Sequence, residues 1–313
     1  MAQTSGARAG SRESRLFPIT TGLAASLVVA LVGGITLVLA RDSLLSVRRC
    51  GLAFWYTRTW DPVAGVFGAF PFLWGTLYSS LLALALSTPI ALGIAVFLSE
   101  ISPHALRRPL IFLTELLAAI PSIVYGLWGI FVLIPMVREL QALAPEWLRA
   151  TPFFQGPPVG VGLLAAGLVL AVMIIPFTAS VSREILKAVP FSQREAAYAL
   201  GATRWEATRM ALFYGRTGII GAIMLGLGRA LGETMAVTMV IGNNPQVSWS
   251  LFAPQHTMAA VIANEFTEAA DDLYLHALVE IGLVLFIVTV VINALSRLLI
   301  WRIGDRAPRA ARA

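Results

Sequence analysis

The stretch SQREAAYALGATRWEATRMALF, residues 192–213, is a polar interruption in a chain that is otherwise strongly apolar. Of the 313 residues, 58% are hydrophobic and only 13% are charged, and the mean hydropathy is +0.78. Soluble domains do not need so much apolar surface, whereas runs of about 20 apolar residues match the length of a helix that crosses a bilayer. The sequence therefore predicts an all-α, polytopic membrane protein. Its six predicted transmembrane helices are residues 17–40, 69–98, 109–137, 159–182, 217–242 and 278–300.

The polar stretch carries the signals of two short helices. Ser192 precedes Glu195 by three residues, and Thr203 precedes Glu206 by the same spacing. Each pair matches a capping box, in which the two side chains satisfy backbone N–H groups at a helix start. Gly201 lies between the pairs, where a helix that ends in the left-handed conformation favours a residue without Cβ. The pattern predicts a helix, a turn at Gly201 and a second helix.

The basic residues predict the orientation of the chain. With six spans both termini lie on one side, and sixteen Lys and Arg residues fall on that side against six on the other. Because Lys and Arg accumulate on the cytoplasmic side of membranes, we expect the termini and the polar stretch to be cytoplasmic. The predicted organisation is a cytoplasmic tail (1–16), a first anchor (17–40), an extracytoplasmic loop (41–68), a membrane core containing the polar stretch (69–300) and a basic cytoplasmic tail (301–313).

Residue types exclude several kinds of chemistry. The single Cys50 cannot form an intrachain disulfide, and the three histidines lack the spacing of a metal site. A P-loop needs Gly-Lys followed by Ser or Thr, yet the only lysine, Lys187, lies between a leucine and an alanine. We therefore expect no metal, no cofactor and no ATP hydrolysis in this chain. Its formal net charge of +6 follows from the basic cytoplasmic side, and no nucleic-acid-binding pattern is present.

Two charged residues fall in the fifth predicted span, within GLGRALGETMAV (226–237). Arg229 and Glu233 are four residues apart, so on a continuous helix they lie on one face and can pair. A charge near the bilayer centre costs about 2.5–3.5 kcal/mol on insertion scales. A guanidinium also matches the geometry of a phosphate-like oxyanion. The pair is therefore either a structural staple or part of an anion pathway.

Three glycines flank this pair on an adjacent helix face. Gly221, Gly228 and Gly232 fall close together at 100° per residue, and small residues let another helix approach closely. We predict that they are helix-packing residues. Glu115 lies only about 9 Å into the third predicted span, so its depth argues against a pair with Arg229. We expect a structural or interfacial role for Glu115.

The polar stretch resembles the EAA loop of ABC-importer permeases. The resemblance rests on Glu195, Ala196 and Ala197 followed by Gly201. In that family the loop is the cytoplasmic element that touches the ATPase, which implies an ATPase-coupling role for these four residues. The stretch departs from the family in its last residues, where an apolar-Leu-Pro ending is usual.

Three further segments are similar to the phosphate-specific ABC-importer permeases of the PstC type. They are ELLAAIPSIVYGLWG (115–129), GRALGETMAV (228–237) and SLFAPQHTMAAVIANEFTEA (250–269). The resemblance covers about residues 69–300 and implies a type I ABC-importer permease fold in the bacterial inner membrane. It also implies that Arg229 and Glu233 belong to the pathway of the substrate, inorganic phosphate.

The same resemblance implies a set of partners. They are a homologous partner permease, two copies of a cytoplasmic ABC ATPase that holds the ATP and Mg²⁺, and an extracytoplasmic phosphate-binding protein. Membrane lipid would surround the chain.

Other functions account for parts of the sequence. A permease for another oxyanion or small solute would share the EAA-like loop but would leave the similarity around Arg229 without a reason. A secondary transporter could use Arg229 and Glu233 for ion coupling, but it predicts inverted internal repeats, and none is found. A membrane scaffold would give no reason for charges inside a span.

Overall fold

The computed structural model describes residues 6–304, with side chains from residue 17 to residue 303, and this part of the chain contains helices and no β-strand. The predicted all-α, six-span architecture is confirmed. Six helical segments are long and apolar enough to cross a membrane: Phe17–Asp42, Phe70–Ile101, Ser122–Leu143, Leu163–Ala188, Arg204–Leu231 and Asp272–Ile303. Residues 1–5 and 305–313 of the two predicted tails lie outside the described residues.

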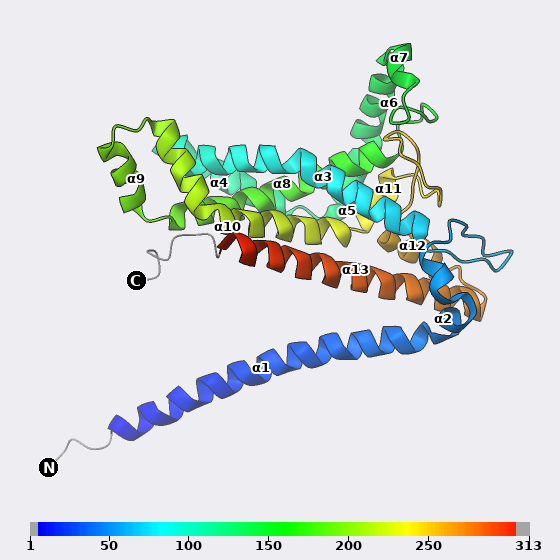
Figure 1. Cartoon of the computed structure of the whole chain (residues 1–313), viewed down its shortest axis with the longest axis horizontal. Coiled ribbons are helices and arrows are strands. Elements are labelled where there is room, and N and C mark those ends of the chain that lie inside the picture. Colours follow the sequence, from blue (N-terminus) through cyan, green and yellow to red (C-terminus); the bar gives the residue numbers. More distant parts are fainter. Residues whose placement is uncertain (1–5, 305–313) are drawn as a thin grey trace.

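The first helix stands apart from the bundle. Helix α1 (Gly6–Asp42) is one uninterrupted helix, so the predicted boundary between tail and anchor at residue 17 is not a structural boundary. Its side chains from residue 17 onward are almost all exposed. It approaches α13 (Asp272–Gly304) only toward its C-terminal end, where Leu39 lies near Gly282, and the two helices diverge toward the N-terminus (Figure 1).

The core of the bundle lies between α3 (Phe70–Val96) and α8 (Leu163–Ala188), with α10 (Arg204–Leu231) against α8. Small buried residues on α3, which include Ser79, Ala83 and Ser87, follow one another at helical spacing. Such a face lets helices approach closely without large side chains between them. Helix α8 is the most enclosed of the six spans, since more than half of its residues are buried.

The third predicted span is not one helix, contrary to the prediction of residues 109–137. The chain forms α4 (His104–Ala119), α5 (Ser122–Trp128), a π-helical turn η3 (Gly129–Leu133) and α6 (Ile134–Leu143). The break falls at Ile120, which is extended (φ −65°, ψ 129°) because Pro121 disfavours the helical conformation in the preceding residue. The hydroxyl of Tyr125 donates across the break to the Leu117 carbonyl at 2.7 Å, so that it satisfies a carbonyl of the last turn of α4.

The fifth predicted span, residues 217–242, also differs. Helix α10 begins at Arg204, inside the polar stretch, and continues without a break to Leu231. Gly232 ends it, and a short separate helix, α11 (Met235–Val240), follows. The second helix of the polar stretch and the fifth span are therefore the same helix.

The two ends of the bundle differ in structure. One end carries α9 (Phe191–Ala199), and the start of α1 and the end of α13 lie toward it (Figure 1). The opposite end carries α2 (Leu44–Cys50), the 3₁₀ turn η1 (Gly51–Trp55), α7 (Glu146–Arg149) and α12 (Met258–Glu265). There Glu265 accepts hydrogen bonds from the Trp60 indole at 2.9 Å and the Tyr274 hydroxyl at 2.6 Å, which joins the loop after η1 to α12 and α13.

Candidate functional site

The polar stretch folds as the predicted helix, turn and helix. Helix α9 ends at Ala199, and Gly201 takes a left-handed φ of +82°. The N–H of Gly201 donates to the Tyr198 carbonyl at 2.9 Å, and the N–H of Ala202 donates to the Ala197 carbonyl at 3.1 Å. These two bonds form a Schellman motif, which satisfies the last carbonyls of the helix and requires a residue at Gly201 that tolerates positive φ.

Only one of the two predicted capping boxes forms. The Thr203 hydroxyl accepts from the Glu206 N–H at 3.4 Å, and the Glu206 carboxylate accepts from the Thr203 N–H at 2.7 Å, so α10 begins as predicted. The predicted box of Ser192 and Glu195 is wrong, because α9 begins at Phe191, directly after Pro190, and Ser192 already lies inside the first turn. As a result the Glu195 side chain is exposed at the surface, beside exposed Ala196 and buried Ala197.

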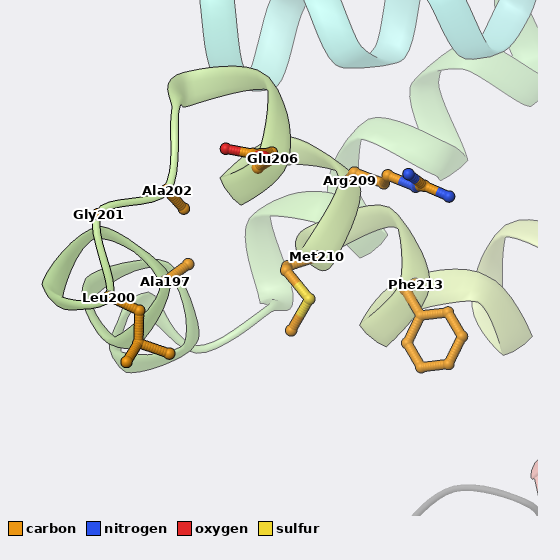
Figure 2. A pocket seen from close by; sticks show the side chains of 8 residues that line it. All are labelled: Ala197, Leu200, Gly201, Ala202, Glu206, Arg209, Met210 and Phe213. Carbon is orange, nitrogen blue, oxygen red and sulfur yellow. The ribbon is translucent and has the colours of Figure 1, made fainter.

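A hollow of about 650 Å³ separates α9 from the first turns of α10. Leu200 lies on one side of it, and Met210 and Phe213 lie on the other (Figure 2). All three side chains are exposed, Leu200 by 90%. Apolar side chains gathered on an otherwise polar end of a protein indicate a surface that another protein covers.

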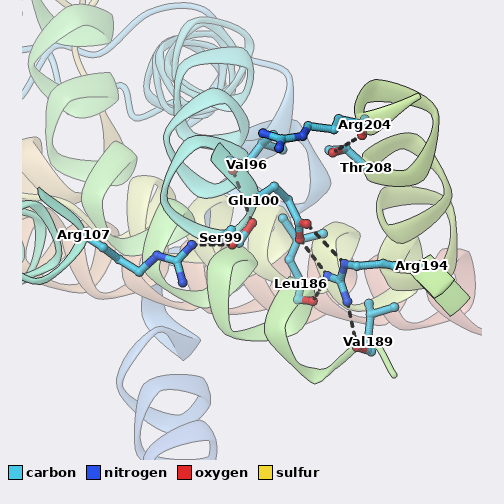
Figure 3. A network of polar contacts seen from close by, with 9 residues as sticks. All are labelled: Val96, Ser99, Glu100, Arg107, Leu186, Val189, Arg194, Arg204 and Thr208. Carbon is cyan, nitrogen blue, oxygen red and sulfur yellow. Dashed lines mark hydrogen bonds and ion pairs between the residues drawn. The ribbon is translucent and has the colours of Figure 1, made fainter. Parts of the chain in front are cut away.

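A buried ion pair fastens α9 to the bundle. The guanidinium of Arg194 donates to both carboxylate oxygens of Glu100, at 2.7 and 3.2 Å, and to the carbonyls of Leu186 and Val189 at the end of α8 (Figure 3). Glu100 lies in η2 (Phe97–Ile101), a π-helical turn that continues α3. The two side chains are only 11% and 15% exposed. A two-pronged contact of this kind fixes the orientation of both partners.

The predicted pair of Arg229 and Glu233 does not form among the described residues. Its premise, one continuous helix, is wrong, because α10 ends at Leu231 and Glu233 lies beyond that end. Glu233 instead accepts the N–H of Ala236 at 3.4 Å, at the start of α11. Arg229 lies in the last turn of α10 with an exposed side chain and no carboxylate within 4.0 Å in the described part of the chain.

Two interrupted spans meet at α11, which follows directly on the end of α10, and Arg229 lies in the last turn of α10. Helix α5, after the break at Ile120, packs on α11, after the break at Gly232; a Cβ at Gly126 would lie 3.2 Å from the Ala236 backbone. In transporters, broken helices gather at substrate sites because their free backbone ends and polar side chains face a cavity and not lipid. The arrangement therefore suits the passage of a polar solute.

The predicted packing glycines do not make close contacts within the described chain. Nothing lies within 4 Å of a Cβ placed at Gly228, and Gly221 and Gly232 have only ordinary contacts. The tight contacts of α10 are at Gly218, against Ile185, and at Gly226, against Ile174 and Thr178 of α8. Packing of a second subunit on the face of Gly221, Gly228 and Gly232 stays a prediction.

The sequence profile of one protein family matches residues 52–306, most of the described chain. The family is described as the binding-protein-dependent transport system inner membrane component. The chain belongs to this family. Its members are membrane permease subunits of ABC importers and not the enzymes that hydrolyse ATP. The match includes α9, α10 and the two broken spans, so the loop and the interrupted helices lie inside the family region.

Two relatives of the permease extend the similarity over nearly the whole chain. A protein of Mesorhizobium japonicum is 46% identical over 93% of this chain and 91% of its own length. A protein of Haemophilus influenzae is 48% identical over 91% of this chain and 92% of its own length. Both are named phosphate transport system permease protein PstC.

Solved structures show the same fold. Two inward-facing crystal forms of the MetNI methionine ABC transporter contain a chain that superposes on this permease with TM-scores of 0.58 and 0.56. Sequence identities are 18% and 19%, and the alignments cover 78% and 74% of this permease and 99% and 94% of the other chains. The predicted fold of a type I ABC-importer permease is confirmed.

Glu115 contacts α8, and its structural or interfacial role stays a prediction. Its carboxylate lies 3.8 Å from the guanidinium of Arg183, which is buried on α8 and also contacts Glu184 at 2.6 Å.

Three residues of the permease that matter for the site were not singled out from the sequence, namely Glu100, Arg194 and Tyr125. Within the described part of the chain, no three His, Cys, Asp or Glu side chains come together as a metal site would require.

Proposed function

We propose that this permease carries inorganic phosphate into the cell, powered by a separate cytoplasmic ATPase. The observation that carries the proposal is the exposed guanidinium of Arg229, which has no carboxylate within 4.0 Å in the described part of the chain and lies in the last turn of α10, just before the broken span at α11. A guanidinium there provides fork-shaped donors for a tetrahedral oxyanion and is not neutralised by Glu233. The names of relatives with 46% and 48% identity support phosphate as that oxyanion.

One arginine does not neutralise phosphate, which is a mixture of monoanion and dianion at pH 7. Glu233 adds a further negative charge close to Arg229 in the sequence. We infer that a homologous partner permease completes the pathway with a second cation across the subunit interface. A Cβ at Gly228 would meet nothing within 4 Å and Gly232 is exposed, so this part of α10 is open to that partner, whereas Gly221 lies beside Ile300 of α13.

The route by which an ATPase would act on the pathway is α10 itself. The helix has 28 residues, about 40 Å at 1.5 Å per residue, and joins the capping box at Thr203 to Arg229 without a break. In this proposal Glu195, Ala196, Ala197 and Gly201 form the surface that docks on the ATPase. Movement of the docked loop would shift α10 as a rod and move Arg229 relative to α5.

The proposed docking of the loop on a cytoplasmic ATPase also sets the orientation of the permease in the membrane. We propose that α9 and both termini are cytoplasmic and that an extracytoplasmic phosphate-binding protein delivers the substrate at the opposite end. The excess of basic residues at the α9 end supports this orientation. This chain holds no nucleotide in the proposal; ATP and Mg²⁺ bind to the two ATPase subunits.

Substrate identity is tested in vesicles that contain the complete transporter. We expect ATP-dependent uptake of radiolabelled phosphate, and neither sulfate nor methionine in tenfold excess should reduce it. The purified permease without its ATPase should give no uptake, even with a proton gradient. Sulfate uptake that equals phosphate uptake would favour the permease for another oxyanion, and gradient-driven flux from this chain alone would favour a secondary transporter.

Docking of the loop is tested by crosslinking. Because Cys50 is the only cysteine, an introduced cysteine is the only thiol of the chain in a Cys50→Ser background. Glu195→Cys, labelled with benzophenone-maleimide, should photocrosslink to the ATPase on irradiation. Val63→Cys, a matched control that is 99% exposed near the opposite end of the bundle, should not. Equal crosslinking at both positions, or none at Glu195→Cys in an active complex, would contradict the docking role.

A further inference from the structure

A basic pocket lies at the end of the bundle opposite α9. It has a volume of about 510 Å³ and is lined by the end of α1, by α2 and by the start of α13: Arg41, Leu44, Leu45, Arg48, Arg49 and His276. The three arginine side chains are exposed. Among the described residues, none of the three has a carboxylate within 4.0 Å, although Asp42 and Asp272 lie close in sequence to members of the pocket.

The position of these arginines is unusual in the proposed orientation. Only six Lys and Arg residues fall on the extracytoplasmic side, and half of them gather in this pocket. Helix α2 presents Arg48 and Arg49 outward because its other face is occupied: Ser46 and the N-cap residue Ser43 are fully buried. Three like charges held together in one pocket repel one another, so an anion that binds among them would relieve that repulsion.

An apolar groove begins where the basic pocket ends. It has a volume of about 460 Å³ and is lined by one face of α1: Leu27, Ala30, Leu31, Gly34, Ile35, Val38 and Leu39. Arg41 follows Val38 by three residues and Gly34 by seven, so it continues the same helix face. The groove lies on the side of α1 near Leu39, the residue that approaches α13 at Gly282. A cationic pocket above an apolar groove has the polarity of one phospholipid molecule.

We propose that this site binds an anionic phospholipid of the extracytoplasmic leaflet, with its phosphodiester among Arg41, Arg48 and Arg49 and an acyl chain in the α1 groove. The leaflet, but not the ligand, rests on the proposed orientation. A helix of a partner subunit would fill the groove but would leave three guanidinium groups without counter-charge. Free phosphate would match the arginines but would leave the groove exposed. Of these three occupants, an anionic lipid is the one that satisfies both surfaces.

The test measures lipid binding to the full permease, purified with the subunits that accompany it. Native mass spectrometry counts bound phosphatidylglycerol after titration, with phosphatidylcholine as the neutral probe. A basic residue near an anionic lipid headgroup contributes about fivefold in affinity, so Arg41→Gln/Arg48→Gln/Arg49→Gln should weaken phosphatidylglycerol binding by roughly a hundredfold. The matched control is Arg58→Gln. Arg58 belongs to the loop before α3 and does not line the basic pocket, since its guanidinium lies over the Phe70 ring, 5.5 Å from the ring centroid.

Each outcome decides the proposal. Loss of phosphatidylglycerol in the triple variant, retention in Arg58→Gln and no displacement of lipid by 10 mM inorganic phosphate would support it. Equal binding of phosphatidylcholine, displacement by inorganic phosphate, or unchanged binding in the triple variant would overturn it. Loss of the partner subunit from the triple variant, with lipid binding unchanged, would assign the surface to a protein interface. Phosphate uptake is measured in the same variants, because failure of phosphate transport in the unmodified transporter would contradict the proposed function and would leave the lipid-binding result unaffected.

Discussion

The guanidinium of Arg194 and the carboxylate of Glu100 join the loop helix α9 to the end of α3 through a mostly buried contact of 2.7 Å. Arg194 also binds two carbonyls at the end of α8, so one side chain ties the loop to two spans of the core. A force applied to α9 therefore reaches the membrane bundle by this contact as well as by the continuous α10. In the proposed function the pair is therefore a second link between the loop and the bundle, formed by the residue that directly precedes Glu195 of the proposed docking surface.

Removal of one member of this ion pair should do more harm than removal of both. Arg194→Gln leaves Glu100 buried without its counter-charge, and loss of one partner of a buried pair costs about 3 kcal/mol. We expect transport and permease-stimulated ATP hydrolysis to fall together in Arg194→Gln and to recover partly in the double variant with Glu100→Gln. Lys187→Gln, which breaks an exposed pair with Glu184, should have no effect. Additive losses in the double variant would rule out coupling through the pair.

Substitutions at Gly201 should follow backbone preference and not size. Nothing lies within 4 Å of a Cβ at this position, but its φ of +82° costs other residues about 1–2 kcal/mol. Asparagine tolerates the left-handed conformation better than valine does. We therefore expect ATPase stimulation in the order glycine, then asparagine, then valine, with membrane insertion unchanged. Equal activity of Gly201→Val and Gly201→Asn would show that the turn is not required.

Two glycines of α10 should respond oppositely to alanine. A Cβ at Gly226 would lie 2.8 Å from both Ile174 and Thr178, so Gly226→Ala should destabilise the isolated permease by about 1–3 kcal/mol. Gly228→Ala should leave the isolated permease unchanged or slightly stabilised, because the position is open and alanine favours helix. The measurement is thermal unfolding in detergent. If a partner permease packs on this face, Gly228→Ala should weaken the assembled transporter only; full assembly would contradict that packing.

The permease should lose stability in mild acid through His256. This side chain is 2% exposed in the loop before α12, and burial lowers its pKa to about 4 from an ordinary value of 6.5. Between these values the unfolded chain binds a proton that the folded chain does not. The contribution of neutral His256 to the free energy of unfolding is therefore fully present above pH 6.5 and falls as the pH drops toward 4. His256→Asn can still accept the Thr257 N–H and should show a smaller loss of thermal stability from pH 7 to 5. Equal pH slopes in both proteins would contradict the assignment.

The sequence predicted those features that depend on neighbouring residues. The six spans follow from the length of apolar runs, and the turn at Gly201 follows from its local pattern. The broken spans were missed because hydropathy does not report an interruption, although Pro121 carried a signal for the first one. The predicted pair of Arg229 and Glu233 was wrong because it assumed one helix that continues to Glu233, whereas α10 ends at Leu231.

Tertiary partners lay beyond local patterns altogether. Glu100 and Arg194 are 94 residues apart in the chain, and nothing near either residue predicts the other. The same holds for Tyr125, whose hydroxyl reaches the Leu117 carbonyl across the break at Ile120.

The central claim is that Arg229 binds the translocated anion. The decisive measurement is uptake of radiolabelled phosphate by vesicles that contain the complete transporter with Arg229→Gln, together with the amount of assembled complex. Uptake should be abolished while assembly stays at the wild-type level, because the guanidinium is exposed and has no carboxylate partner among the described residues. Arg229→Lys should recover little, since an ammonium group lacks the fork of donors. Normal uptake by Arg229→Gln, or loss of uptake only through loss of assembly, would contradict the claim.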